Sequence, residues 1–183
     1  MKSPKIPGAL TGCAGEHFVA YRLSAMGYLV ALTRSGAPSV DLMVGTADGR
    51  NAVAIQVKTN NQAFSPAGKK KKEPACWYWP IGAKAKELRG ESAFYAFVDL
   101  NGGTGEPMPD VFIVPADIVA KNMDEAFPKN AKDGRTTWVS VWEKPGKPPM
   151  YFFHIEASEN RKEKEAKWQE AWHLIELALR VSK

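Results

Sequence analysis

Four polar residues within the first 60 positions have the types and spacing needed to hold a cation beside an anionic substrate. Glu16 and Asp41 are carboxylates, and Gln56 and Lys58 alternate with apolar residues in the stretch "AVAIQVKT". Carboxylate oxygens suit a hard cation such as Mg²⁺ or Mn²⁺. Such a cation polarises a phosphodiester and activates water, and a neighbouring lysine stabilises the charge that develops.

The lysine of this stretch needs an explanation. Val53, Ile55 and Val57 lie on one face of the expected strand, so Gln56 and Lys58 share the other. A lysine in a buried strand is costly unless it has an anionic partner. Nearby carboxylates, and a bound phosphate, would supply that partner, and the Val57 carbonyl offers a neutral oxygen ligand beside them.

The first element that must position these groups is a helix between Thr11, a plausible N-cap, and Gly27, a plausible residue just after its end. Successive helical residues are about 100° apart, so Glu16 shares a stripe with Val19 and Leu23. Glu16 is therefore expected at the rim of the surface on which the helix packs. Residues 1–10 contain two prolines and a glycine and are expected to form a loose arm.

Three strands should follow, over residues 28–34, 39–45 and 51–59. The turn "TADGR" contains Asp-Gly and joins the last two in a hairpin. Asp41 shares a face of its strand with Met43, and cross-strand neighbours in a hairpin lie close together. Asp41 should thus reach the face that carries Gln56 and Lys58, if the register allows.

The rest of the chain predicts one α/β domain over residues 1–183, with a mixed sheet flanked by helices. Residues 60–76 have no clear pattern and form a basic loop, and a long C-terminal helix is expected over 158–182. Further strands are expected near 77–80, 92–100, 111–115, 135–142 and 150–155, and a helix is expected from Ala116. The stripe of the C-terminal helix would be Trp168, Trp172, Ile175 and Leu179.

Charge is distributed unevenly along the chain. Residues 1–100 hold 13 Lys and Arg against 7 Asp and Glu, whereas residues 101–183 hold 12 against 13. A basic half favours an acidic partner, of which nucleic acid is the commonest. The candidate phosphate contacts are Arg34, Lys69, Lys70, Lys71 and Lys72. No apolar run is long enough to span a membrane, and no signal peptide is evident, so a cytoplasmic protein is expected.

These motifs resemble the PD-(D/E)XK nuclease superfamily, in particular its Holliday-junction resolvase-like and Mrr-like branches. The matching segments are Gly15-Glu16 in the helix, Ser39-Val40-Asp41 in the second strand and Gln56-Val57-Lys58 in the third. The resemblance covers roughly residues 11–100. It implies a restriction-endonuclease-like core and a Mg²⁺- or Mn²⁺-dependent endonuclease that hydrolyses DNA, with a homodimer as one acting form.

The resemblance also implies roles for individual residues. Glu16 and Asp41 would hold the metal with Gln56 and the Val57 carbonyl, and Lys58 would serve the transition state. Two departures from the family pattern stand out. Pro38 lies three residues before Asp41 instead of adjacent to it, and Gln56 replaces the usual acidic residue, as in the Mrr-type variant. An amide is a weaker metal ligand than a carboxylate.

Other interpretations stay open at this point. Lys58 could end an edge strand and reach water, and the four loop lysines could be a solvated run. The leading alternative to an enzyme is a nucleic-acid-binding or protein-interaction module with a nuclease-like fold and no catalysis. A third alternative is an unrelated core whose basic surface binds an acidic protein.

Overall fold

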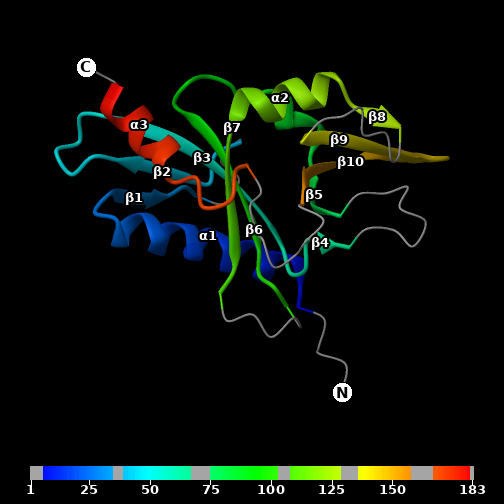
Figure 1. Cartoon of the computed structure of the whole chain (residues 1–183), viewed down its shortest axis with the longest axis horizontal. Coiled ribbons are helices and arrows are strands. Elements are labelled where there is room, and N and C mark those ends of the chain that lie inside the picture. Colours follow the sequence, from blue (N-terminus) through cyan, green and yellow to red (C-terminus); the bar gives the residue numbers. More distant parts are fainter. Residues whose placement is uncertain are drawn as a thin grey trace.

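The computed structural model describes residues 6–34, 39–66, 75–102, 108–128, 136–157 and 167–181, which form two five-stranded sheets with helices packed on them (Figure 1). In chain order the elements are α1 (Gly8–Ala25), β1 (Leu29–Leu32), β2 (Leu42–Gly45), β3 (Ala52–Asn60), β4 (Phe64–Ser65), β5 (Cys76–Ile81), the 3₁₀ helix η1 (Ala83–Lys86), β6 (Ala93–Asp99), β7 (Asp110–Pro115), α2 (Ala116–Asp124), β8 (Phe127–Pro128), β9 (Thr137–Lys144), β10 (Lys147–Glu156) and α3 (His173–Val181).

The first sheet has the strand order β1-β2-β3-β6-β7. Its pairs are antiparallel except for β3 and β6, which run parallel. A parallel pair needs a crossover connection, and here the chain passes through β4, β5 and η1 between the two strands. The mixed sheet and the helix–strand–hairpin order predicted from the sequence are confirmed.

The second sheet has the order β4-β5-β10-β9-β8 and is built around the β9–β10 hairpin. The sequence predicted strands close to β5, β9 and β10 but not that they form a sheet of their own. The pattern of a strand indicates which residues share a face, whereas its partners are set by long-range packing. The long register of β5 against β10 is such a long-range contact.

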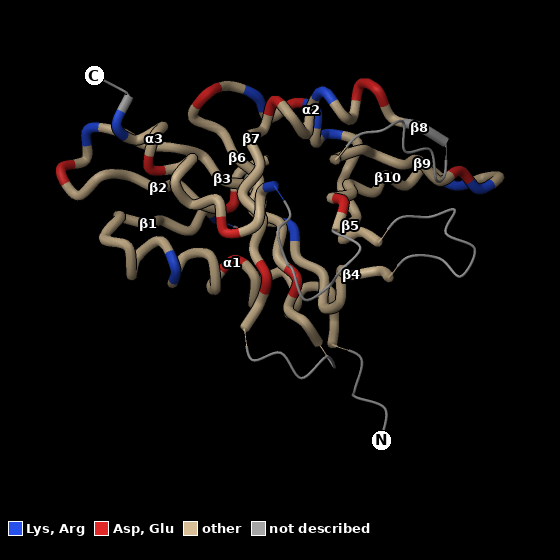
Figure 2. The backbone as a smooth tube through the Cα atoms, viewed as in Figure 1, with Lys and Arg blue, Asp and Glu red and all other residues tan. Residues whose placement is uncertain are grey.

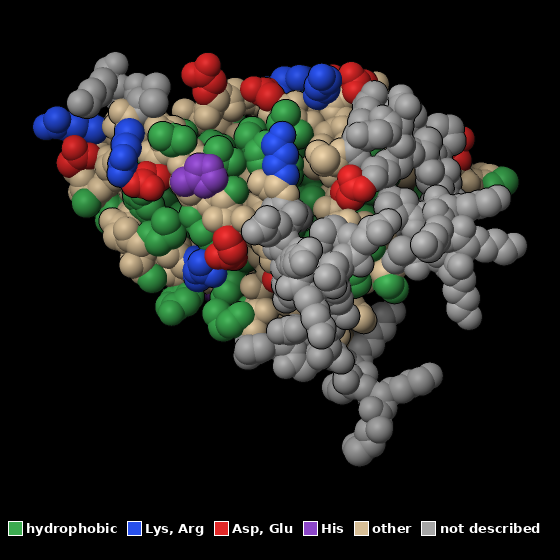
Figure 3. Space-filling model, in the orientation of Figure 1, with side chains coloured by type: hydrophobic (Ala, Val, Ile, Leu, Met, Phe, Trp, Pro, Cys, Tyr) green, Lys and Arg blue, Asp and Glu red, His purple; other side chains and the backbone are tan. Residues whose placement is uncertain are grey.

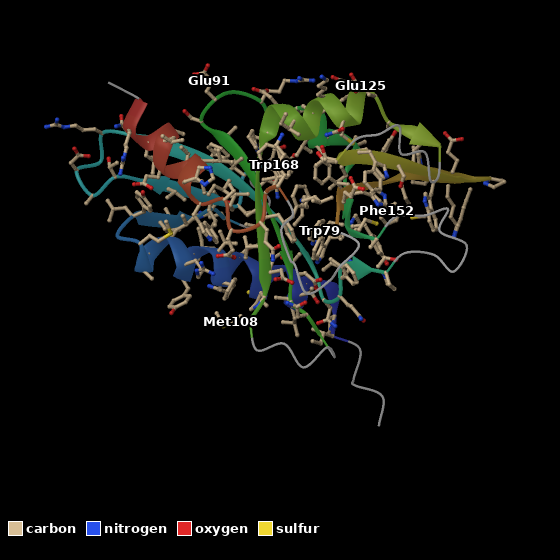
Figure 4. All side chains as sticks on the ribbon, viewed as in Figure 1. Trp79, Glu91, Met108, Glu125, Phe152 and Trp168 are labelled. Carbon is tan, nitrogen blue, oxygen red and sulfur yellow. The ribbon has the colours of Figure 1, made fainter. Side chains whose placement is uncertain are left out.

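The two faces of the first sheet have different partners. One face packs against α1 and α3, and Val19, Ile55 and Leu179 are buried in that layer. The other face packs against the second sheet and α2 over its β6–β7 half, where Phe97 contacts Trp79 with ring centroids 5.1 Å apart. Figures 1 and 4 show α1 and α3 on one side of the molecule and the second sheet, with Trp79, on the other.

The β1 edge of the first sheet leaves apolar side chains in contact with solvent. Leu29 on β1 is 57% exposed and Met43 on β2 is 42% exposed. In the space-filling view, apolar side chains gather on the surface over the α1 and β1 side of the molecule (Figure 3). The second sheet therefore covers the β6–β7 half of the sheet face that is turned away from α1, and it leaves the β1–β3 part of that face uncovered.

Helix α1 begins earlier than the sequence predicted. It starts at Gly8 with Pro7 as N-cap, so residues 8–10 of the expected loose arm are helical. Thr11 is not the cap but lies buried inside the first turns, where its hydroxyl donates to the Pro7 carbonyl at 3.4 Å. Proline suits a helix start because backbone N–H groups there have no partner within the helix, so the absence of an N–H loses no hydrogen bond. Gly27 follows the helix with a φ of +91°, in agreement with its expected place.

The expected C-terminal helix over 158–182 is wrong for its described middle part, because α3 spans only His173–Val181. Residues 167–172 instead lie against the edge of β7. The Ile113 N–H donates to the Trp168 carbonyl at 2.9 Å, and the Glu170 N–H donates to the Val111 carbonyl at 2.8 Å. Figure 4 shows Trp168 beside β7. Residues 158–166 lie outside the described residues.

The expected loop over 60–76 is also shorter than predicted. Asn60 belongs to β3, residues 64–65 form β4, and Cys76 begins β5. The Phe64–Ser65 strand pairs with β5, which makes it the edge of the second sheet. Residues 67–74, with the four lysines, lie outside the described residues, and the single-domain assignment stays a prediction.

Candidate functional site

Asp41 is held at the point where the β2–β3 ladder ends. Its N–H donates to the Ile55 carbonyl at 2.9 Å, one position beyond the paired strand. Its Oδ2 atom accepts two hydrogen bonds, one from the Val57 N–H at 2.8 Å and one from the Gln56 side-chain amide. These bonds fix the carboxylate against β3, and the contact of Asp41 with the Gln56 side predicted from the hairpin is confirmed.

Gln56 and Lys58 lie on the face of β3 that is turned away from α1. Gln56 is buried and Lys58 is half-buried, whereas Ile55 and Val57 on the opposite face pack in the α1 layer. Gln56 is opposite Tyr95 of β6 in the parallel register. The alternation of the strand thus places an amide, an ammonium and a phenol on one face of the sheet.

These side chains line a pocket of about 270 Å³ between β3 and η1, formed by Ser39, Asp41, Gln56, Lys58, Gly82, Lys84, Ala85 and Tyr95. The Tyr95 hydroxyl donates to the Ala85 carbonyl at 3.0 Å, which ties η1 to the sheet. Burial, assisted by the negative charge of Asp41, raises the pKa of Tyr95 to about 12. Tyr95 therefore stays protonated at neutral pH.

Tyr95 and Lys84 were not singled out from the sequence. Tyr95 lies in a strand that is apolar throughout, and its position opposite Gln56 depends on the parallel pairing of β3 with β6. Lys84 lies in the short 3₁₀ helix η1, whose place over the pocket depends on tertiary packing. The alternation within "SAFYAFVDL" was the only available signal, since it puts Tyr95 and Phe97 on one face.

Glu16 lies at the rim of this cluster and is half-buried on α1. Partial burial, together with the negative charge of Asp41, raises the pKa of Glu16, while His17 and Lys58 act in the opposite direction. The carboxyl group thus lies close enough to Asp41 and Lys58 to feel both charges. It does not line the pocket itself, so the structure brings three of the four candidates together in the pocket and sets Glu16 beside them.

Gly15 explains how α1 comes so close to the site. A Cβ atom at this position would lie 2.8 Å from Thr59 Cγ2 and 2.9 Å from Thr59 Cβ, with Thr59 Oγ1 closer still. Only glycine allows the helix to contact β3 at Thr59, the neighbour of Lys58. This contact sets the position of Glu16, the next residue of the helix.

The donors present fit a hard cation, although none of the described residues form a group of three His, Cys, Asp or Glu. Burial, and to a lesser degree the like charge of Asp41, raises the pKa of Glu16, and a bound cation would offset the repulsion between the two carboxylates. Amide and backbone oxygens must complete such a site. The Val57 N–H points to Asp41. In a strand the C=O of a residue points to the same side as its N–H, so the Val57 carbonyl oxygen is the backbone candidate for this site.

The candidate nucleic-acid contacts are only partly described. Arg34 is exposed and directly follows Thr33, whose N–H donates to the Asp41 carbonyl at 2.9 Å. It therefore lies near the Asp41 segment, whereas Lys69, Lys70, Lys71 and Lys72 lie outside the described residues. Elsewhere, basic and acidic residues are interleaved along α2 and at the tip of β9 and β10 (Figure 2). None of the helices in the described ranges is long and apolar enough to cross a bilayer.

No protein-family model matches the chain, and no curated protein matches it. Among solved structures, the chain is similar to the bacterial homing endonuclease I-Ssp6803I, with a TM-score of 0.54 and 16% sequence identity. The match covers 96% of this chain and 94% of that chain. At this identity the likeness shows the fold, which is α/β and nuclease-like.

Proposed function

We propose that this protein is a metal-dependent endonuclease of the PD-(D/E)XK type that hydrolyses DNA phosphodiester bonds. The observation that carries the proposal is the meeting of Asp41, Gln56 and Lys58 in one pocket, with Glu16 beside it. Gln56 and Lys58 belong to β3, Asp41 directly precedes β2 and Glu16 lies on α1, so three separate segments contribute to one site. The nuclease-like fold supports the same conclusion, although a fold alone does not determine an activity.

In this proposal Asp41 and Glu16 hold Mg²⁺ or Mn²⁺, with the Val57 carbonyl and the Gln56 side-chain oxygen as neutral ligands. The Gln56 amide uses its N–H on Asp41, which leaves its carbonyl oxygen for the cation. When bound, the cation supplies Lewis acidity and a more acidic water. Lys58 contacts the phosphate and stabilises the negative charge that develops on it.

Replacement of Asp41 by asparagine tests the proposal. Asp41→Asn keeps the size of the side chain and one acceptor oxygen for the Val57 N–H, so the fold should persist. The change removes the charge that would hold the cation, so cutting of plasmid DNA in Mg²⁺ or Mn²⁺ should be abolished. The parent protein should also lose activity when a chelator is added.

The control for this experiment is the fold of the variant, followed by thermal unfolding, and its binding of uncut DNA. Loss of cutting with normal unfolding and binding would support the assignment. Full activity of Asp41→Asn would show that the metal is not held by this residue.

A second candidate function is a DNA-binding module without catalysis. It is favoured by Gln56, because the pocket then offers a single carboxylate and depends on Glu16 for another. DNA binding without cutting in Mg²⁺ or Mn²⁺ would support this alternative. If both strands of a duplex are cut, two sites are needed, and a homodimer would supply them.

A further inference from the structure

Lys84 lines the same pocket as Lys58 but belongs to a different element of the fold. It is the second residue of η1 and is exposed, and its neighbours Gly82 and Ala85 line the same pocket. Lys58 lines the pocket from β3. Two lysines that are 26 residues apart in the sequence therefore line one small pocket.

Neither lysine forms an ion pair within the described residues; the ion pairs found there use arginines. The negative group of the pocket, Asp41, is already bound by Gln56 and the Val57 N–H. An anion bound in this pocket would be attracted by both positive side chains.

The size of the pocket indicates which anion fits. Pockets for drug-sized ligands hold about 300–1,000 Å³. The present pocket, at about 270 Å³, lies below that range and is open enough to have an exposed lysine in its wall. These properties suit one phosphate group of a chain that continues outside the pocket, and not an enclosed nucleoside.

We propose that Lys84 is a second phosphate-contacting residue, which binds a backbone phosphate of the DNA together with Lys58. The inference rests on the proposed function, since it takes the DNA backbone as the ligand of this pocket. Lys84 lies outside the helix–strand–hairpin segment that carries the other candidate site residues. Lys84 would clamp the phosphate near the carboxylates, and η1 would be the element that positions it.

The chain offers a matched control in Lys86. Lys86 lies two residues further along η1, is also exposed, and does not line the pocket. A 3₁₀ helix has about three residues per turn, so residues two apart point in different directions. Replacing either lysine by alanine removes one positive charge from the same element, but only Lys84→Ala removes it from the pocket.

The experiment measures binding of one duplex by fluorescence anisotropy across a salt series, in chelator so that no cutting competes. One phosphate contact contributes about 0.9 to the slope of log affinity against log salt. The slope for Lys84→Ala should therefore be flatter by about 0.9 than that of the parent, and the slope for Lys86→Ala should be unchanged. Between 50 and 200 mM salt, the affinity ratio of parent to Lys84→Ala should shrink about 3.5-fold.

Lys84→Arg keeps the charge and should restore the parent slope. Equal slopes for Lys84→Ala and Lys86→Ala would overturn the inference, and the Asp41→Asn result on cutting would still stand. A flatter slope for Lys84→Ala in a protein that cuts no DNA would support the phosphate contact and refute the endonuclease. A parent protein that binds no DNA would overturn both.

Discussion

The contact between Gly15 and Thr59 gives a prediction that links the packing of α1 to the site. Gly15→Ala would place a Cβ atom 2.8–2.9 Å from two carbons of Thr59 and nearer still to its hydroxyl oxygen. Thr59 is β-branched and short, so it has few rotamers with which to move away. Either α1 or β3 must shift, which carries Glu16 away from Asp41.

The magnitude follows from two opposing effects. Overpacking a close contact costs about 1–3 kcal/mol. Alanine in a helix interior is favoured over glycine by about 1 kcal/mol, which offsets part of that cost. We therefore expect Gly15→Ala to lower the free energy of unfolding by about 0–2 kcal/mol relative to the parent.

Gly12→Ala is the matched control on the same helix. A Cβ atom at Gly12 meets nothing within 4 Å, so this variant gains helix propensity without a clash. The two variants should differ in the free energy of unfolding by about 1–3 kcal/mol. At about 2–4 °C per kcal/mol for a chain of this length, the midpoints of thermal unfolding should separate measurably.

A second replacement checks the cause. Thr59→Ala removes the hydroxyl and methyl groups that the new Cβ atom would meet but keeps the Thr59 Cβ atom at 2.9 Å. Gly15→Ala combined with Thr59→Ala should therefore recover part of the lost stability. The reasoning would be refuted if Gly15→Ala were as stable as Gly12→Ala, because α1 would then not depend on the close approach to β3.

Two further variants test the metal ligands and the basic loop. Gln56→Glu should bind Mn²⁺ more tightly in a calorimetric titration, because a charged ligand replaces an amide; unchanged or weaker affinity would mean that residue 56 does not face the metal. Replacing Lys69, Lys70, Lys71 and Lys72 together by alanine should flatten the slope of log DNA affinity against log salt by about 2–4, with normal cutting at saturating DNA. Equal slopes for the parent and the four-alanine variant would show that the four lysines do not contact phosphates.

The contact between Asp41 and Gln56 could be predicted from the sequence because it is local. The alternation of β3 and the Asp-Gly turn together set which residues face each other across the hairpin. The pocket as a whole could not be predicted, because Tyr95 depends on the parallel pairing of β3 with β6, and Lys84 on the packing of η1. Both depend on a crossover through the second sheet, which has no signature in the residues of the site.

The C-terminal segment shows the opposite failure, in which a local pattern was overridden. Trp168, Trp172, Ile175 and Leu179 have helical spacing, yet the helix begins only at His173. The backbone around Gln169 instead bonds to the free edge of β7, and Glu170 takes a φ of +51°. Hydrogen bonds to an open strand edge stabilise this segment in a way that side-chain periodicity does not reveal.

The amide at position 56 has a physical consequence in the protein without a cation. The buried Gln56 side chain donates a hydrogen bond to the half-buried Asp41 carboxylate. A carboxylate at this position could not donate and would add a like charge, and a hydrogen bond to a charged group contributes about 1.5–3 kcal/mol. The amide therefore stabilises the fold before a metal binds, at the expense of one charged ligand. A site built in this way would keep its geometry without the cation and bind it more weakly, which makes the response of Gln56→Glu to Mn²⁺ informative about both effects.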